Sequence, residues 1–161
     1  MIEHGNILVP TDFSPSSNEA LRRACVLADT FGAHVHLLHV IDPVLFIDPD
    51  LIAIPPVEEM TEALRKSAER RLGEQVRGMD TDVEIFVHVE EGSGDPSRTI
   101  CSFAERLPAD LIVIGRHGRQ GMLEHLLIGS TAERVVRHAP CSVLVAMPHG
   151  LLAAASGEAN G

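Results

Sequence analysis

DLIVIGRHGRQGMLEHLLIGS, residues 110–130, contains the strongest structural signal in this chain. It begins with an apolar segment at 110–114, which predicts a short buried strand. That strand runs directly into Gly115 and Gly118, two more glycines stand at 121 and 129, and Ser130 opens a predicted helix. The stretch is therefore a strand, a glycine-rich loop and a helix start in close succession.

This order is typical of loops that bind phosphate. Glycine lets a ligand come close to the backbone, and the first turn of a helix presents unpaired N–H groups and the positive end of the helix dipole. We therefore expect a nucleotide at Gly115–Ser130, with a glycine-rich turn that binds nothing as the alternative.

Lysine content excludes one class of nucleotide site. The sole lysine is Lys66, in a predicted helix far from the glycines. A Walker A loop needs Gly-x4-Gly-Lys-Ser/Thr, so the chain cannot form one. Schiff-base chemistry has the same single, poorly placed candidate.

Composition predicts one globular domain over 1–147 and a disordered tail over 148–161. The chain has 161 residues, of which 45% are hydrophobic and 22% charged, an ordinary globular balance. The formal charge of −10 argues against nucleic acid as a partner, because nucleic-acid binders carry clustered lysine and arginine. Any phosphate site must therefore be local.

Cysteine usage and the beginning of the chain favour a cytoplasmic protein. Cys25, Cys101 and Cys141 are an odd number without a Cys-x-x-Cys pair, so we expect reduced, structural thiols. The first residues have no basic region typical of a signal peptide, and no apolar run approaches membrane-spanning length. We expect no membrane association.

Apolar periodicity alternates between strand and helix along the chain. Strands are predicted at 6–10, 34–40, 82–90, 110–114 and 142–147, and helices at 15–31, 58–77, 96–107 and 130–139. This alternation predicts an α/β fold: a five-stranded parallel doubly wound sheet with helices on both faces, Rossmann-like.

Capping residues set the predicted helix ends. Ser14 is a candidate N-cap before Pro15, with the capping box Ser16–Glu19 as the alternative, and Gly32 suits the helix end. Asp95 is expected to cap the third helix, and the capping box Ser130–Glu133 the fourth.

The segment 41–57 is the longest predicted loop. Its four prolines forbid a regular element. A purely solvated linker would not carry as many apolar side chains as Leu45, Phe46, Ile47, Leu51, Ile52 and Ile54. We expect it either to cover the sheet as a lid or to contact a second subunit.

Five segments together resemble the universal stress protein family over about residues 4–147. They are ILVPTDFS (7–14), GDP (94–96), DLIVIG (110–115), GSTAERVV (129–136) and APCSVLV (139–145), in the family's order. The resemblance implies a stress-response protein that binds ATP, AMP or ADP, and a homodimer formed through the last strand, Ser142–Met147.

The family's ATP-binding branch carries Gly-x2-Gly-x9-Gly-Ser/Thr. Here Gly115 and Gly118 fit, but ten residues separate Gly118 from Gly129. An extra residue within a helix would rotate all later residues of that helix by about 100°, so we expect a loop to absorb it.

The resemblance also implies particular site residues. It puts adenine near Val40. It also puts the loop after the first strand near both the adenine base and the ribose. The implied nucleotide-binding residues are Pro10, Thr11, Asp12, Val40, Gly115, Arg116, His117, Gly118, Arg119, Gly129, Ser130 and Thr131. A position beyond the carboxyl ends of parallel strands agrees with the general rule for open α/β sheets.

Several of these side chains have a second interpretation. Asp12 can hold a ribose hydroxyl or Mg²⁺, or it can form an Asx turn or a helix cap. Arg116 and Arg119 can pair with phosphate or be solvated, and His117 can contact phosphate, act as an acid–base group, or only pack.

The histidines of the second predicted strand do not suggest a metal centre. His34 and His36 share one face and His39 points to the other, so the three cannot converge on one ion. We expect no metal site apart from a magnesium ion bound with the nucleotide.

Three functions remain open on these grounds. The preferred one is a homodimeric regulatory module that binds ATP or AMP and alters contacts with an unknown protein partner. The second is slow ATP hydrolysis or self-phosphorylation on Ser130 or Thr131, although no catalytic residues stand out. The third is a nucleotide-free dimeric adaptor that uses the apolar loop 43–57 and the last strand.

Overall fold

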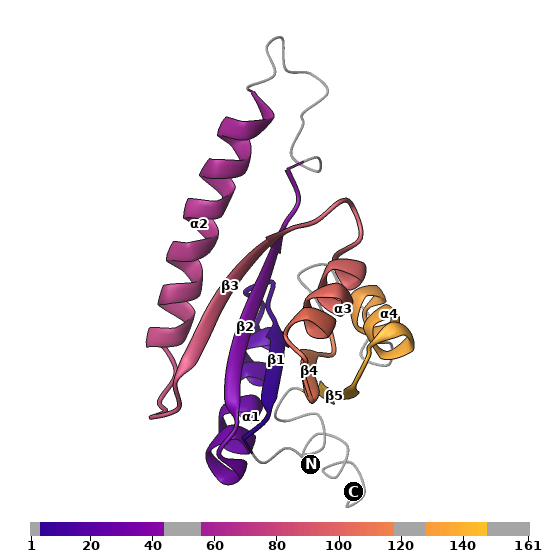
Figure 1. Cartoon of the computed structure of the whole chain (residues 1–161). Helices are drawn as coiled ribbons and strands as arrows, with labels where there is room; N and C mark the ends of the chain where they lie inside the picture. Colours follow the sequence, from indigo (N-terminus) through magenta and orange to yellow (C-terminus); the bar gives the residue numbers. More distant parts are fainter. Residues whose placement is uncertain (1–3, 44–55, 118–127, 148–161) are drawn as a thin grey trace, which may run out of the picture.

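A computed structural model describes residues 4–43, 56–117 and 128–147 as one parallel sheet with flanking helices (Figure 1). In chain order the elements are β1 (Asn6–Pro10), α1 (Pro15–Phe31), β2 (His34–Ile41), α2 (Val57–Arg77), β3 (Ile85–Glu91), α3 (Pro96–Arg106), β4 (Leu111–Gly115), α4 (Ser130–His138) and β5 (Ser142–Ala146). All strand pairs are parallel, in the order β3-β2-β1-β4-β5. The predicted five-stranded fold is confirmed.

Each sheet face is covered by two helices. In β1, Ile7 and Val9 pack on one face, against α1 and Leu72 of α2, whereas Leu8 packs on the other face against α3 and α4. This alternation follows from the two-residue period of a strand. The sheet is therefore doubly wound, as the sequence predicts.

The first helix and the third begin as predicted. Ser14 Oγ accepts a hydrogen bond from the Ser17 amide at 3.2 Å, and Gly32 ends α1 with a φ of 64°. Asp95 caps α3 by accepting from the Ser97 amide at 3.1 Å. The alternative capping box Ser16–Glu19 is wrong, because the Glu19 carboxylate bonds to two arginines of α1 instead.

One predicted cap and one predicted boundary are also wrong. α4 begins at Ser130 as predicted, but Gly129 is its N-cap and no side chain caps it. Glu133 pairs with Arg137 at 2.8 Å, one helical turn further on, so the predicted capping box does not form. β3 starts at Ile85 rather than at 82, because Val35 is the first residue of β2 that pairs with it.

The edge of the sheet at β2 and β3 carries a group of aromatic side chains that we call the histidine patch: His34, His36, Phe86 and His88. His36 Nδ1 lies 3.0 Å from His88 Nε2, and the Phe86 ring stacks on His36 with centroids 5.1 Å apart. Partial burial lowers the pKa of His36 from 6.5 to about 4, with the neighbouring His88 and His34 as smaller causes. Burial also lowers the pKa of His88, opposed by Glu90, which pairs with Arg106 of α3.

These lowered pKa values make the stability of the protein depend on pH. Unfolded histidine binds a proton below about pH 6.5, whereas His36 in the fold stays neutral to about pH 4. The contribution of His36 to the free energy of unfolding is therefore fully present above pH 6.5. It is lost as the pH falls from 6.5 toward 4. Because both rings are partly exposed, we expect a loss of only about 1–2 kcal/mol between pH 7.5 and 5.

Urea unfolding at a series of pH values measures this loss. His36→Gln removes the titrating imidazole, so its free energy of unfolding should fall less over the same range. An equal pH slope in parent and variant would contradict the assignment to His36.

No helix within the described ranges is both long and apolar enough to cross a membrane. The loop 44–55 and the tail 148–161, for which the sequence makes predictions, lie outside these ranges.

Candidate functional site

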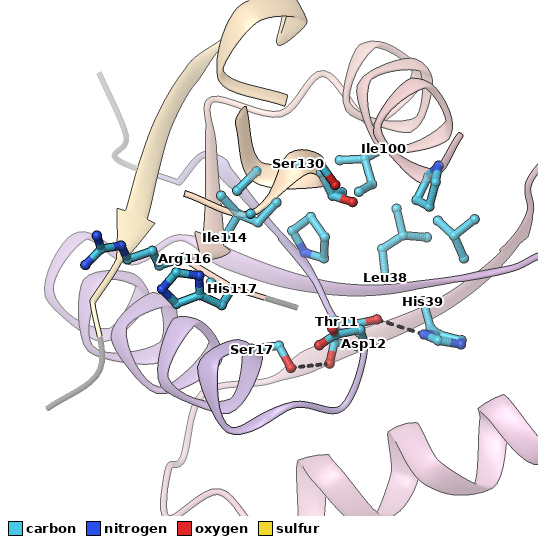
Figure 2. Close-up of a pocket in the computed structure, with 17 residues that line it drawn as sticks. Thr11, Asp12, Ser17, Leu38, His39, Ile100, Ile114, Arg116, His117 and Ser130 are labelled. Carbon is cyan, nitrogen blue, oxygen red and sulfur yellow. Dashed lines mark hydrogen bonds between the residues drawn. The ribbon is translucent and has the colours of Figure 1, made fainter. Parts of the chain in front are cut away.

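A cavity of about 450 Å³ opens at the carboxyl ends of β1, β2 and β4 (Figure 2). β1 and β4 are neighbours in the sheet but not in the sequence, and the chain changes sheet face between them. This is the topological switch point, where open α/β sheets bind ligands. The cavity is the candidate site.

The loop between β1 and α1 is held by its own polar groups. The Thr11 amide donates to the Leu38 carbonyl at 2.8 Å, and Thr11 Oγ1 donates to Gln75 Oε1 of α2 at 3.0 Å. Asp12 Oδ1 accepts from the Ser14 amide at 3.0 Å. Asp12 therefore forms the Asx turn that its second interpretation predicts, while it also lines the cavity.

Gly115 ends β4 against the start of α1. A Cβ atom added there would lie 2.7 Å from the carbonyl carbon of Ser16 and 2.8 Å from its oxygen. Such contacts are far inside van der Waals separation, so only glycine fits. The close packing of β4 against α1 therefore requires glycine at position 115, whether or not a ligand binds nearby.

Arg116 does not turn its charge toward the cavity. Its guanidinium lies beside the end of β5, away from Thr11 and Ser130 (Figure 2), with Nη1 3.6 Å from Met147 Sδ. Its amide donates to the Ala146 carbonyl at 3.2 Å. This placement favours a structural role for Arg116 over phosphate pairing.

The two ends of the glycine-rich stretch meet. The Gly129 amide donates to the Arg116 carbonyl at 2.8 Å, which brings the start of α4 to the end of β4. Both flanks of the ten-residue spacing therefore lie at the cavity, whereas residues 118–127, where we expect a loop to absorb the extra residue, lie outside the described residues. Gly118 and Arg119 themselves lie outside the described residues.

Ten of the twelve predicted site residues line this one cavity: Pro10, Thr11, Asp12, Val40, Gly115, Arg116, His117, Gly129, Ser130 and Thr131. The remaining lining residues were not predicted: Ser17, Leu38, His39, Pro96, Ile100, Ile114 and Ala132. Leu38, Ile100 and Ile114 give the cavity an apolar floor. Apolar walls with a few placed polar groups are typical of ligand sites.

His39 is the most informative of the unpredicted residues. Its Nδ1 lies 2.7 Å from the Thr11 carbonyl oxygen, so Nδ1 carries the proton and donates. The ring also packs on Phe13 with centroids 4.4 Å apart. The sequence could have indicated His39 as a site residue, because it precedes Val40 at the end of a predicted strand.

The three thiols take no part in this site. Cys25 and Cys101 are buried, Cys141 is half-buried, and all three are free. Burial raises the pKa of each thiol, which keeps it protonated and unreactive. The predicted structural role of the cysteines agrees with this.

Taken together, these features define an open α/β protein with a cavity at the switch point of a parallel sheet. The chain belongs to the universal stress protein family, whose model matches residues 3–146. A universal stress protein of Methanocaldococcus jannaschii is 39% identical over 139 residues, covering 86% of this chain and 79% of the relative. The structure of universal stress protein UspA from Lactobacillus plantarum superposes with a TM-score of 0.69 at 31% identity, covering 90% and 99% of the two chains.

Two further structures of the family share the fold at 20% identity. One is a universal stress protein in complex with cAMP, with a TM-score of 0.61 and coverage of 90% and 98%. The other is the universal stress protein from Archaeoglobus fulgidus in complex with dAMP, with a TM-score of 0.58 and coverage of 91% and 100%.

Proposed function

We propose that this stress-family protein is a regulatory module that binds an adenine nucleotide, ATP or AMP/ADP, in the cavity at the ends of β1, β2 and β4. The observation that carries the proposal is the convergence of the β1–α1 loop, the end of β2 and the start of α4 on one cavity with an apolar floor. The complexes of two relatives with cAMP and dAMP support an adenylate as the ligand class.

Each part of the nucleotide has a matching part of the cavity. The base takes the apolar floor beside Val40, and the ribose lies near Thr11 and Asp12. The phosphates take the first turn of α4, where Ser130 and Thr131 offer backbone N–H groups and the positive end of the helix dipole. Asp12 is the candidate ligand for Mg²⁺ carried with the phosphates.

Ser130→Asp tests the phosphate position without removing packing. An acidic residue in the first turn of a helix is favourable, so the melting temperature should stay unchanged or rise. The same carboxylate faces the proposed phosphates, and we expect Mg-ATP affinity to fall by about tenfold or more. Calorimetric titration is the measurement, because the chain contains no tryptophan or tyrosine to report binding.

Ser130→Ala is the matched control, because it removes the hydroxyl without adding charge and should weaken binding less. Mass spectrometry of denatured protein identifies any nucleotide that copurifies. Equal affinity in parent and Ser130→Asp would place the phosphates elsewhere. No bound nucleotide and no heat with ATP, ADP or AMP would favour the adaptor without nucleotide.

We also propose that two copies pair through β5. This strand lies at the edge of the sheet with the sequence SVLVA, and Leu144 is 37% exposed on it. An exposed apolar edge strand is a natural place for pairing with another chain. Sedimentation velocity should show a dimer for the parent and a monomer for Leu144→Lys.

Val136→Lys is the control for that change. Val136 is 50% exposed, but it lies on α4 rather than on the edge strand. A parent that sediments as a monomer, or a Val136→Lys variant that dissociates alone, would contradict pairing through β5.

A further inference from the structure

The histidine patch contains two imidazole nitrogens in a spacing that a metal ion requires. His36 Nδ1 and His88 Nε2 are 3.0 Å apart and come from neighbouring strands, β2 and β3. Two imidazoles that bind one ion at about 2.0–2.1 Å, with bond angles between a right angle and the tetrahedral value, hold their nitrogens about 2.9–3.4 Å apart. The observed separation falls within that range.

The other nitrogen of His36 is fixed by a hydrogen bond. The Asn6 side-chain amide donates from Nδ2 to the Leu107 carbonyl at 3.1 Å, which directs its Oδ1 toward His36. His36 Nε2 lies 3.3 Å from this Oδ1 and therefore carries the proton. The neutral ring then keeps its lone pair on Nδ1, which accepts the Nε2–H of His88 in a hydrogen bond. An ion takes the place of that proton when His88 changes to its other tautomer, with the proton on Nδ1. An outer hydrogen bond of this kind is a regular feature of histidine ligands to metals.

Both rings are also held by aromatic neighbours. Phe86 stacks on His36 at an interplanar angle of 20°, and Phe103 of α3 lies 4.9 Å from the His88 ring, centroid to centroid. Packing of this kind restricts ring rotation, which lowers the cost of ordering ligands when an ion binds.

We propose that His36 and His88 form a surface site for a divalent transition-metal ion of the class that prefers imidazole, such as Ni²⁺, Cu²⁺ or Zn²⁺. Within the described ranges no set of three histidine, cysteine or carboxylate side chains converges on one point. Water completes the coordination shell, so the site is open and binds with moderate affinity. The ion bridges β2 to β3, the edge strand of the sheet.

The position of this pair separates it from the nucleotide-binding residues. Neither His36 nor His88 lines the nucleotide cavity, to which β2 contributes Leu38, His39 and Val40. Binding there is therefore independent of the proposed function.

Calorimetric titration with Ni²⁺ and with Zn²⁺ at pH 7.5, in chelator-treated protein, tests the proposal. We expect one micromolar site in the parent and at least about tenfold weaker binding in His88→Gln, which removes one of two ligands. His138→Gln is the matched control, because it removes an exposed imidazole at the end of α4 and should bind like the parent. Ser130→Asp should also bind metal like the parent.

Electron paramagnetic resonance of the parent with one equivalent of Cu²⁺ gives a second readout that needs no variant. Coupling to two imidazole nitrogens is expected. Coupling to a single nitrogen, or a Ni²⁺ affinity that His88→Gln leaves unchanged, would overturn the site.

Discussion

Gly115→Ala should lower the free energy of unfolding by about 2–3 kcal/mol, the cost of forcing extra volume into a close-packed position. The added methyl would lie 2.7 Å from the backbone carbon of Ser16 and 2.8 Å from its carbonyl oxygen. A flexible side chain could turn aside, but the backbone at the start of α1 can yield only if helix and strand move apart. Urea unfolding measures the loss.

The same substitution should weaken nucleotide binding, because Gly115 lines the cavity and packs against the start of α1, which follows the β1–α1 loop. The His117 amide donates to Ser16 Oγ at 3.3 Å, so the chain just after β4 is also bonded to the start of α1. We expect Mg-ATP affinity to fall by about tenfold if the ends of β4 and α1 separate by as little as an ångström.

Gly78→Ala is the matched control for this change. A Cβ there meets the carbonyl oxygens of Gln75 and Glu74 at an ordinary 3.5 Å, and the backbone has a φ of −79°. Stability should change by no more than about 0.5 kcal/mol. If Gly115→Ala were as stable as Gly78→Ala, the close contact between β4 and α1 would be refuted.

Gly115 also shows what the sequence could and could not predict. The glycine after a buried strand predicts a close approach of a phosphate to the backbone, whereas the close approach that the structure shows is to the backbone at the start of α1. The partner in the approach is Ser16, which lies about a hundred positions earlier, and no local pattern names it. Periodicity, by contrast, is local, so the order of strands and helices and the doubly wound sheet could be predicted in full.

The first residue of α4 was predicted correctly, but its cap was not, for a related reason. Serine followed three residues later by glutamate is a capping-box signal, yet Gly129 takes the cap and Ser130 is already helical. The Gly129 amide bonds to the Arg116 carbonyl, a tertiary contact that fixes where the helix begins. A contact between distant segments thus overrides a local preference of about 1 kcal/mol.

Contacts from α2 to the site could not be predicted from the sequence either. Gln75 is 64 positions from Thr11, yet its Oε1 accepts from Thr11 Oγ1, and its Nε2 donates to Asn18 Oδ1 at 2.6 Å. Arg71 places its guanidinium 4.0 Å from the centre of the Phe13 ring. The amphipathic pattern of α2 predicts a helix on the sheet but says nothing about which loop it meets.

These contacts lead to the prediction for Leu72→Ala, which should cost about 2–4 kcal/mol of stability. Leu72 is fully buried, and it and Ala68 are the two buried residues of the 21-residue helix α2. Truncation leaves a cavity beneath a helix that has little other apolar anchorage. Glu69→Ala, an exposed change on the same helix, should alter stability by no more than about 0.5 kcal/mol.

Leu72→Ala should also loosen the β1–α1 loop. Arg71 and Gln75 lie close to Leu72 on α2, and both contact that loop. Amides of the loop should then exchange hydrogen faster in Leu72→Ala, and Mg-ATP affinity should fall. Gln75→Ala separates the two effects: it leaves the core intact, so it should weaken nucleotide binding with a much smaller loss of stability. If Gln75→Ala bound Mg-ATP with full affinity, α2 would contribute to the fold but not to nucleotide binding. Reduced affinity would show that the packing of α2 also positions the β1–α1 loop for the ligand.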